Sequence, residues 1–175
     1  MQSFFTDGDI LQEESDNSKN TKQIKMVIDN DVLEQYEAYY FAIHRKASKK
    51  PIAHPYHESI NTWMIMKRPM MNALKQKWKD FIVWFIRAQG YANLHIEQCE
   101  VEQTVYYPNN RRHDIDNSVP KFILDGMVES GLILDDDWKV VRKITLCCCV
   151  DEDYPRTELL IKIFNKESEG NKNGE

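Results

Sequence analysis

Two groups of aspartates, about twenty residues apart, are the side chains of this sequence best suited to chemistry. Asp114 and Asp116 stand two positions apart, and Asp135, Asp136 and Asp137 form a continuous run. In an extended chain, residues two apart face the same side, so the first two carboxylates would point the same way. Neighbouring carboxylates repel one another unless a cation joins them. Hard oxygen ligands suit Mg²⁺, with Mn²⁺ as a substitute, so the pattern predicts a divalent-metal site.

Each aspartate group also has a purely structural interpretation. Aspartate pairs are common in surface loops, Asp116 could cap the start of a helix, and the run at 135–137 could be a solvated turn. Two features favour a metal site instead. Arg111 and Arg112 directly precede the first pair, and both groups flank one short helical pattern. The sequence has no cluster of cysteine and histidine that would predict zinc.

The hydrophobic periodicity predicts helices and strands that could position these residues. Apolar residues recur at helical spacing over 31–47 and 63–88, and again from near Ser118 to Gly131, with Pro120 in the first turn. Alternating patterns rich in β-formers cover residues 94–107, 140–150 and 157–164. The order predicts an α+β fold: a small mixed or antiparallel sheet packed by two main helices, with an extra N-terminal helical segment.

The composition bounds the organisation of the chain. With 175 residues, 42% of them hydrophobic, the chain predicts one globular domain. We predict a disordered acidic tail over 1–22, a helical extension over 23–50, the main domain over 51–165 and a disordered tail over 166–175. No apolar run is long enough for a membrane helix, and the N-terminus lacks signal-peptide features. We therefore expect a cytoplasmic protein with no membrane partner and reduced cysteines.

The charge distribution bears on possible partners. A formal net charge of -5 argues against a polyanion, but the basic residues are clustered. Lys75, Lys77 and Lys79 lie on one predicted helix, and Arg111 and Arg112 precede the first aspartate pair. The lysines have two interpretations, a solvated helix face or contacts to phosphate.

Three segments together resemble the RusA family of Holliday junction resolvases. They are D-I-D-N at 114–117, P-K-F-I-L-D-G-M-V-E-S-G-L-I at 120–133, and D-D-D-W-K-V at 135–140. The likeness covers most of residues 55–164 and would make 51–165 a nuclease domain. It implies an α+β homodimer that requires Mg²⁺ and nicks four-way DNA junctions symmetrically.

The resemblance also implies roles for individual residues. The metal-binding carboxylates correspond to Asp114, Asp116 and Asp136. Counting forward from Asp125 and Gly131 selects Asp136, whereas counting back from Val140 selects Asp137, and we choose Asp136. The catalytic lysine corresponds to Lys121, although one residue more than usual separates it from Asp116. The alternative role for Lys121 is an ion pair with Asp125, one helical turn away.

The expected function is therefore a Mg²⁺-dependent, structure-specific endonuclease acting on branched DNA in recombination and repair. Lys75, Lys77, Lys79, Arg111 and Arg112 would contact the DNA backbone. Two alternatives are a non-catalytic branched-DNA-binding protein of the same fold and a protein whose acidic residues hold a structural cation. We expect one of the two apolar faces of strands 140–150 and 157–164, with the 63–88 helix nearby, to line the dimer interface, unless these faces only fill the core of the monomer.

Overall fold

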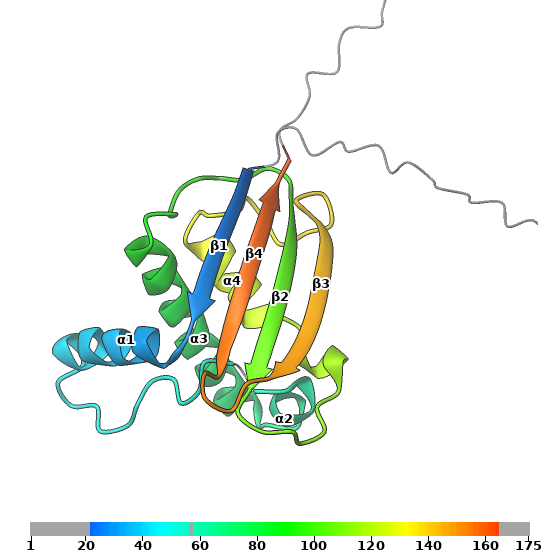
Figure 1. Cartoon of the computed structure of the whole chain (residues 1–175). Helices are drawn as coiled ribbons and strands as arrows, with labels where there is room; N and C mark the ends of the chain where they lie inside the picture. Colours follow the sequence, from blue (N-terminus) through cyan, green and yellow to red (C-terminus); the bar gives the residue numbers. More distant parts are fainter. Residues whose placement is uncertain (1–21, 57, 165–175) are drawn as a thin grey trace, which may run out of the picture.

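The computed structural model describes residues 22–56 and 58–164, which form a four-stranded mixed sheet with helices packed against it. In order across the sheet the strands are β1 (Lys22–Ile28), β4 (Arg156–Ile163), β2 (Cys99–Tyr107) and β3 (Val141–Val150) (Figure 1). Strand β4 runs antiparallel to both of its neighbours, whereas β2 and β3 are parallel. The helices are α1 (Asn30–Ile43), α2 (Ile60–Met64), α3 (Arg68–Ala88) and α4 (Lys121–Glu129), with a 3₁₀ turn η1 (Ile115–Ser118). The predicted α+β class is confirmed.

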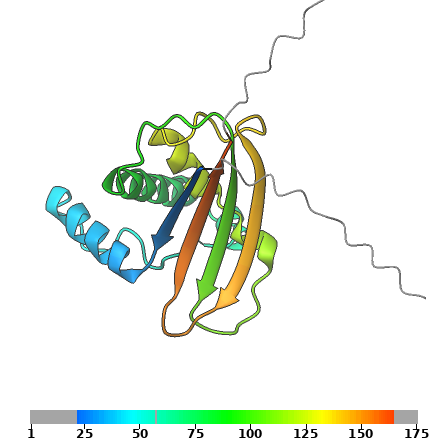
Figure 2. The same cartoon turned by 45° about the horizontal axis from the view of Figure 1, so that its top comes forward.

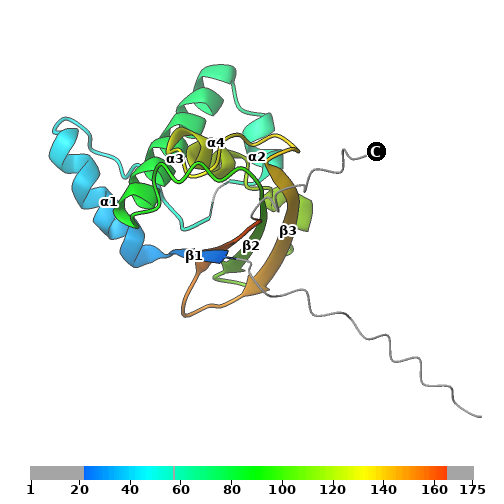
Figure 3. The same ribbon diagram turned by 90° about the horizontal axis from the view of Figure 1, so that it is seen from above.

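Helices α3 and α4 lie on the same side of the sheet (Figures 2 and 3). Alternate residues of β2 and β4, such as Val101 and Ile161, are buried in the same core cluster as Trp78 and Phe81 of α3. Helix α4 packs closely on α3 at Gly126, where an added Cβ would lie 2.5 Å from the Cβ of Ile82. A glycine is therefore needed where the two helices cross. This close contact sets the position of α4 and of the residues at its ends.

The N-terminal part of the fold differs from the prediction of a helical extension over 23–50. Residues 22–28 form β1, which pairs with β4 along its whole length and buries Ile24, Met26 and Ile28. These three residues stand at every second position, which is the period of a strand, but a segment this short gives few repeats of that period. The predicted helix is present as α1, with Asp29 capping its start. The predicted tails, apart from Lys22 itself, lie outside the described residues.

The remaining elements differ from the prediction mainly at their ends. The helix predicted over 63–88 is two helices, and α3 begins anew at Arg68 with Pro69 in its first turn. The central helix begins at Lys121, not near Ser118, because residues 115–118 form η1 and Pro120 precedes α4. Strand β4 has a neighbour on both sides, and its residues Leu159 and Ile161 are buried in the core of this chain. No helix among the described residues is long and apolar enough to cross a membrane.

Candidate acidic site

The first aspartate pair lies on a bent segment rather than on an extended strand. Asp114 has an extended backbone, with φ −82° and ψ 129°, but Asp116 lies inside η1. The amide of Asn117 donates to the carbonyl of Asp114 over 3.0 Å, which closes the turn. The chain is therefore not extended through both residues, which was the condition for the two carboxylates to share a face, but both side chains are exposed.

The turn is fixed to the sheet through Ser118, which is 4% exposed. Its hydroxyl donates to the carbonyl of Ile115 over 2.7 Å, and its Oγ lies 3.6 Å from Sγ of Cys148 on β3. From β2, the buried Gln103 donates its Nε2 hydrogen to the carbonyl of Ser118. The sequence analysis did not identify either Ser118 or Gln103 as a residue that holds the turn. The available signal was Gln103, a polar residue at an inward position of a strand that is otherwise apolar on that face.

The segment before the turn is held by ring stacking and bears a weak ion pair. The ring of His113 stacks on Tyr107 with centroids 3.7 Å apart. Burial raises the pKa of Tyr107 to about 12, so its phenol stays neutral at ordinary pH. Nε of Arg112 lies 3.2 Å from Oδ1 of Asp114, and the two side chains are 89% and 51% exposed. Such an exposed pair contributes only about 0–1 kcal/mol and is easily exchanged for another partner.

Lys121 is exposed at the first position of α4, and among the described residues it forms no ion pair. The alternative pairing with Asp125 is not formed, since Oδ2 of Asp125 lies 3.0 Å from Nζ of Lys75 on α3. Nζ of Lys79 similarly lies 3.4 Å from Oε2 of Glu129. Two of the lysines predicted to bind DNA therefore tie α3 to α4.

Of the other three cations predicted to bind DNA, Arg112 forms the exposed pair with Asp114 described above, and two remain. Lys77 and Arg111 are exposed, and no ion pair involves either within the described residues.

The three aspartates of the second group have different local roles. Oδ1 of Asp135 accepts from the amide of Asp136 at 2.7 Å. Oδ1 of Asp137 accepts from the amides of Lys139 and Val140, at 2.8 and 3.1 Å, and so holds the turn that leads into β3. The exposed carboxylate of Asp136 has no hydrogen-bond partner within the part of the chain that the structure describes. This difference supports the choice of Asp136 over Asp137 as the carboxylate available to a ligand.

We expect these roles to separate in stability measurements. Asp137→Ala should lower the free energy of unfolding by about 1 kcal/mol, because two turn amides lose their acceptor, as happens when a helix N-cap is removed. Asp136→Ala should change it by less than about 0.5 kcal/mol, as surface substitutions do. Urea denaturation of both variants measures the difference. A loss for Asp136→Ala equal to that for Asp137→Ala would show that Asp136 has a structural role.

The structure does not bring the two acidic groups together within one chain. Val141, at the start of β3, pairs with Cys99, and Asp137 lies one turn before it. Ser118 contacts Cys148, seven residues further along β3, which corresponds to about 23 Å of strand. Accordingly, within residues 22–56 and 58–164 no group of three His, Cys, Asp or Glu side chains is placed to hold a metal ion. Asp114 and Asp116 lie near one end of β3, and Asp136 lies near the other.

The first pair nevertheless suits a hard divalent cation. Mg²⁺ retains several waters and binds proteins through one or two carboxylates, with substrate phosphate completing its coordination. Asp114 and Asp116 offer two exposed carboxylates on an anchored turn. Asp136 lines a separate cavity of about 180 Å³, together with Lys75, Lys79, Asp125, Val128 and Glu129.

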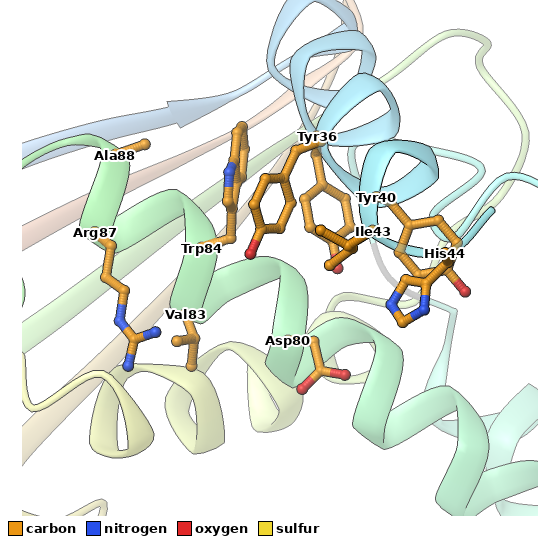
Figure 4. Close-up of a pocket in the computed structure, with 10 residues that line it drawn as sticks. Tyr36, Tyr40, Ile43, His44, Asp80, Val83, Trp84, Arg87 and Ala88 are labelled. Atoms are coloured by element: carbon orange, nitrogen blue, oxygen red, sulfur yellow. The ribbon is translucent and has the colours of Figure 1, made fainter.

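A hollow of about 520 Å³ between α1 and α3 contains none of the predicted site residues. Figure 4 shows Tyr36 projecting from α1 toward Trp84 of α3, whereas the ring of Tyr40 lies beside that of His44. The ring of Tyr36 lies 5.0 Å from that of Phe81 and 5.1 Å from that of Trp84, measured between centroids. These aromatic contacts hold α1 against α3, on a different side of α3 from the one that meets α4.

Comparisons with known proteins add no identification to this geometry. Neither the protein-family models nor the curated protein sequences with which the chain was compared gave a match.

Proposed function

We propose that the protein is a Mg²⁺-dependent endonuclease that nicks four-way DNA junctions during recombination and repair. The observation that carries this proposal is the arrangement at the start of α4. Two exposed aspartates lie on a turn anchored to the sheet, and Lys121, which forms no ion pair with any residue that the structure describes, follows at the first helical position. The resemblance of residues 114–140 to RusA resolvases supports the same reaction, on the same residues.

Each residue would have a distinct task. Asp114 and Asp116 would hold the metal ion, which when bound supplies a Lewis acid for the phosphate and activates water. Lys121 would stabilise the negative charge that develops on the phosphate. Arg111 and Lys77 would bind backbone phosphates without reading sequence. Arg112 would exchange its weak pairing with Asp114 for a phosphate when DNA arrives.

The cytoplasm is the proposed compartment for this activity. All four cysteines are free, as in proteins of a reducing compartment.

One observation favours a second candidate, a branched-DNA-binding protein without nuclease activity. In a single chain Asp136 lies far along β3 from Asp114 and Asp116, so these three carboxylates do not form one site. This candidate shares the basic side chains but needs no metal.

Junction binding and junction cleavage separate the two candidates. The purified protein is incubated with a labelled four-way junction and with a linear duplex of the same sequence, with Mg²⁺ and with EDTA. The proposal predicts a gel shift for the junction in both conditions and nicks only with Mg²⁺. A junction-specific shift without nicks would favour the non-catalytic candidate, and no preference for the junction would contradict both.

A further inference from the structure

The hollow between α1 and α3 has no part in the acidic site, and its lining combines aromatic rings with charged groups (Figure 4). Helix α1 contributes three tyrosines, and α3 contributes an acid, a tryptophan and a base at helical spacing: Tyr36, Tyr39, Tyr40, Asp80, Trp84 and Arg87. Tyr39 is 46% exposed, and Ile43, at the end of α1, is 57% exposed. Single exposed apolar residues are ordinary, but a concave cluster of them marks a binding surface.

The rings on this surface lie close to parallel. The ring of Tyr39 is 5.9 Å from that of Trp84 and 6.2 Å from that of Tyr36, with interplanar angles of 29° and 28°. Stacked rings with an exposed face suit a flat aromatic ligand, because offset stacking is a favoured arrangement of π-systems. A nucleobase is such a ligand, and every base has a face on which an aromatic side chain can stack.

The charges beside the rings indicate where the base and its phosphates would lie. Oδ1 of Asp80 accepts from Nε2 of Gln76 over 2.7 Å, whereas Oδ2 has no hydrogen-bond partner among the described residues. A carboxylate repels phosphate but accepts hydrogen bonds from the amino group of a base. Arg87, in the last turn of α3, is exposed and forms no ion pair within residues 22–56 and 58–164, so it is available to a phosphate.

The hollow continues past the end of α1. A second cavity, of about 470 Å³, shares Tyr40, Ile43 and His44 with the first and is also lined by Arg45. Arg45 is exposed and has no ion pair in the part of the chain that the structure describes. The two cavities together, called here the α1–α3 groove, have Arg87 beside the first and Arg45 beside the second. This length and charge suit a strand of more than one nucleotide.

We infer that the α1–α3 groove binds an unpaired stretch of a DNA strand, with bases stacked on Tyr39 and Trp84 and phosphates on Arg87 and Arg45. In a duplex the faces of each base are already stacked, so the groove should select single strands. An acidic peptide would also meet the arginines, but it would bring like charge to the carboxylate of Asp80.

The groove is separate from the acidic site. Helix α1 directly follows β1 at one margin of the sheet, whereas the turn that carries Asp114 and Asp116 contacts β3 at the other margin (Figure 1). The inference rests on the proposed function only in taking DNA, rather than RNA, as the strand. Binding in the groove requires neither a metal ion nor cleavage.

Fluorescence anisotropy in EDTA tests the groove without the metal-dependent site. The probe is a labelled deoxycytidine oligonucleotide of about twelve nucleotides, and its matched probe has the same phosphates on abasic sugars. The wild type should bind the first probe about tenfold more tightly than the second, because only the first has bases to stack. Equal affinities would overturn the inference, since the contacts would then be to phosphate alone.

Three variants test the position of the stacked base. Tyr39→Leu keeps an apolar side chain without the ring and should weaken binding of the deoxycytidine probe by about tenfold, with no change for the abasic probe. Tyr39→Phe keeps the ring and should bind as the wild type does. Trp138→Leu removes a ring that is 72% exposed on the turn before β3, and it should also bind normally. No loss for Tyr39→Leu, or an equal loss for Trp138→Leu, would place the strand elsewhere and overturn the inference.

Salt dependence separates the phosphate contacts from stacking. For single strands the logarithm of the binding constant falls with the logarithm of the salt concentration by about 0.7 for each phosphate neutralised. Arg87→Ala should therefore reduce the slope by about 0.7, whereas Tyr39→Leu should leave it unchanged. Lys143→Ala, which removes an exposed cation from β3, is the matched control and should alter neither slope nor affinity. An unchanged slope for Arg87→Ala would contradict the inferred path of the strand.

The result is independent of nicking. A wild type that binds the single strand through Tyr39 but never nicks a junction would support the groove and contradict the proposed nuclease. Nicking of a junction without single-strand binding would do the reverse. Light scattering identifies another occupant: a wild type that is dimeric, does not bind the probe and becomes monomeric on Tyr39→Leu would show that the groove is a contact between two copies, which would overturn the inference.

Discussion

Asp116→Asn is expected to abolish nicking of a four-way junction while leaving junction binding intact or tighter, and Asp114→Asn should do the same. Each change removes a carboxylate that would hold the metal ion. Loss of an outer partner of a metal ligand already costs about 10–100-fold, so loss of a ligand should cost about 100-fold or more. The same change removes negative charge that repels DNA phosphate, so affinity should not fall.

The measurement is a single-turnover nicking rate, with a gel shift in EDTA on the same samples. Both aspartates are exposed, and the turn is held by Ser118 and Gln103, so the variants should unfold at the wild-type temperature. Asp135→Asn is the matched control, since it removes the same charge from the second group and should retain nicking. Rates within tenfold of wild type for Asp114→Asn or Asp116→Asn would remove those residues from the site.

Lys121→Ala is expected to lower the nicking rate by about 100- to 1,000-fold, the usual loss when one group that stabilises transition-state charge is removed. The structure makes this a clean test. Because Asp125 pairs with Lys75, loss of the Lys121 ammonium breaks no ion pair among the described residues. Stability should therefore change by less than about 0.5 kcal/mol.

Two further variants make the result for Lys121 specific. Lys46→Ala removes the same charge from an exposed position after α1 and should leave the rate unchanged. Lys121→Arg keeps a cation at the start of α4 and should recover part of the rate. An unchanged rate for Lys121→Ala would show that the extra residue between Asp116 and this lysine has moved the catalytic cation elsewhere.

The fold class and most elements could be predicted because apolar periodicity is local information. Strand β4 shows it clearly, because Leu159, Ile161 and Ile163 stand at every second position. The break between α2 and α3 could not be predicted with the same ease, because apolar residues continue through it. Strand β1 was missed because a seven-residue segment gives few repeats of its period, and its role becomes clear only when β4 lies beside it.

The site was predictable in its residue types but not in its assembly. The sequence places Asp114, Asp116 and Asp136 near one helix and says nothing of the path between them. The distance between the groups depends on where η1 and the turn at Asp137 meet β3, which are tertiary contacts. Likewise, an i,i+4 pairing of Lys121 with Asp125 is a local expectation that a lysine from another helix overrides.

The central claim is tested most directly by mapping the nicks in a four-way junction whose strands are labelled separately. With Mg²⁺, the wild-type protein should introduce two nicks at symmetry-related phosphates in opposing strands and release linear duplexes, and with EDTA it should bind without cutting. The absence of nicks with Mg²⁺ or Mn²⁺, at protein concentrations where a gel shift shows the junction fully bound, would contradict the account.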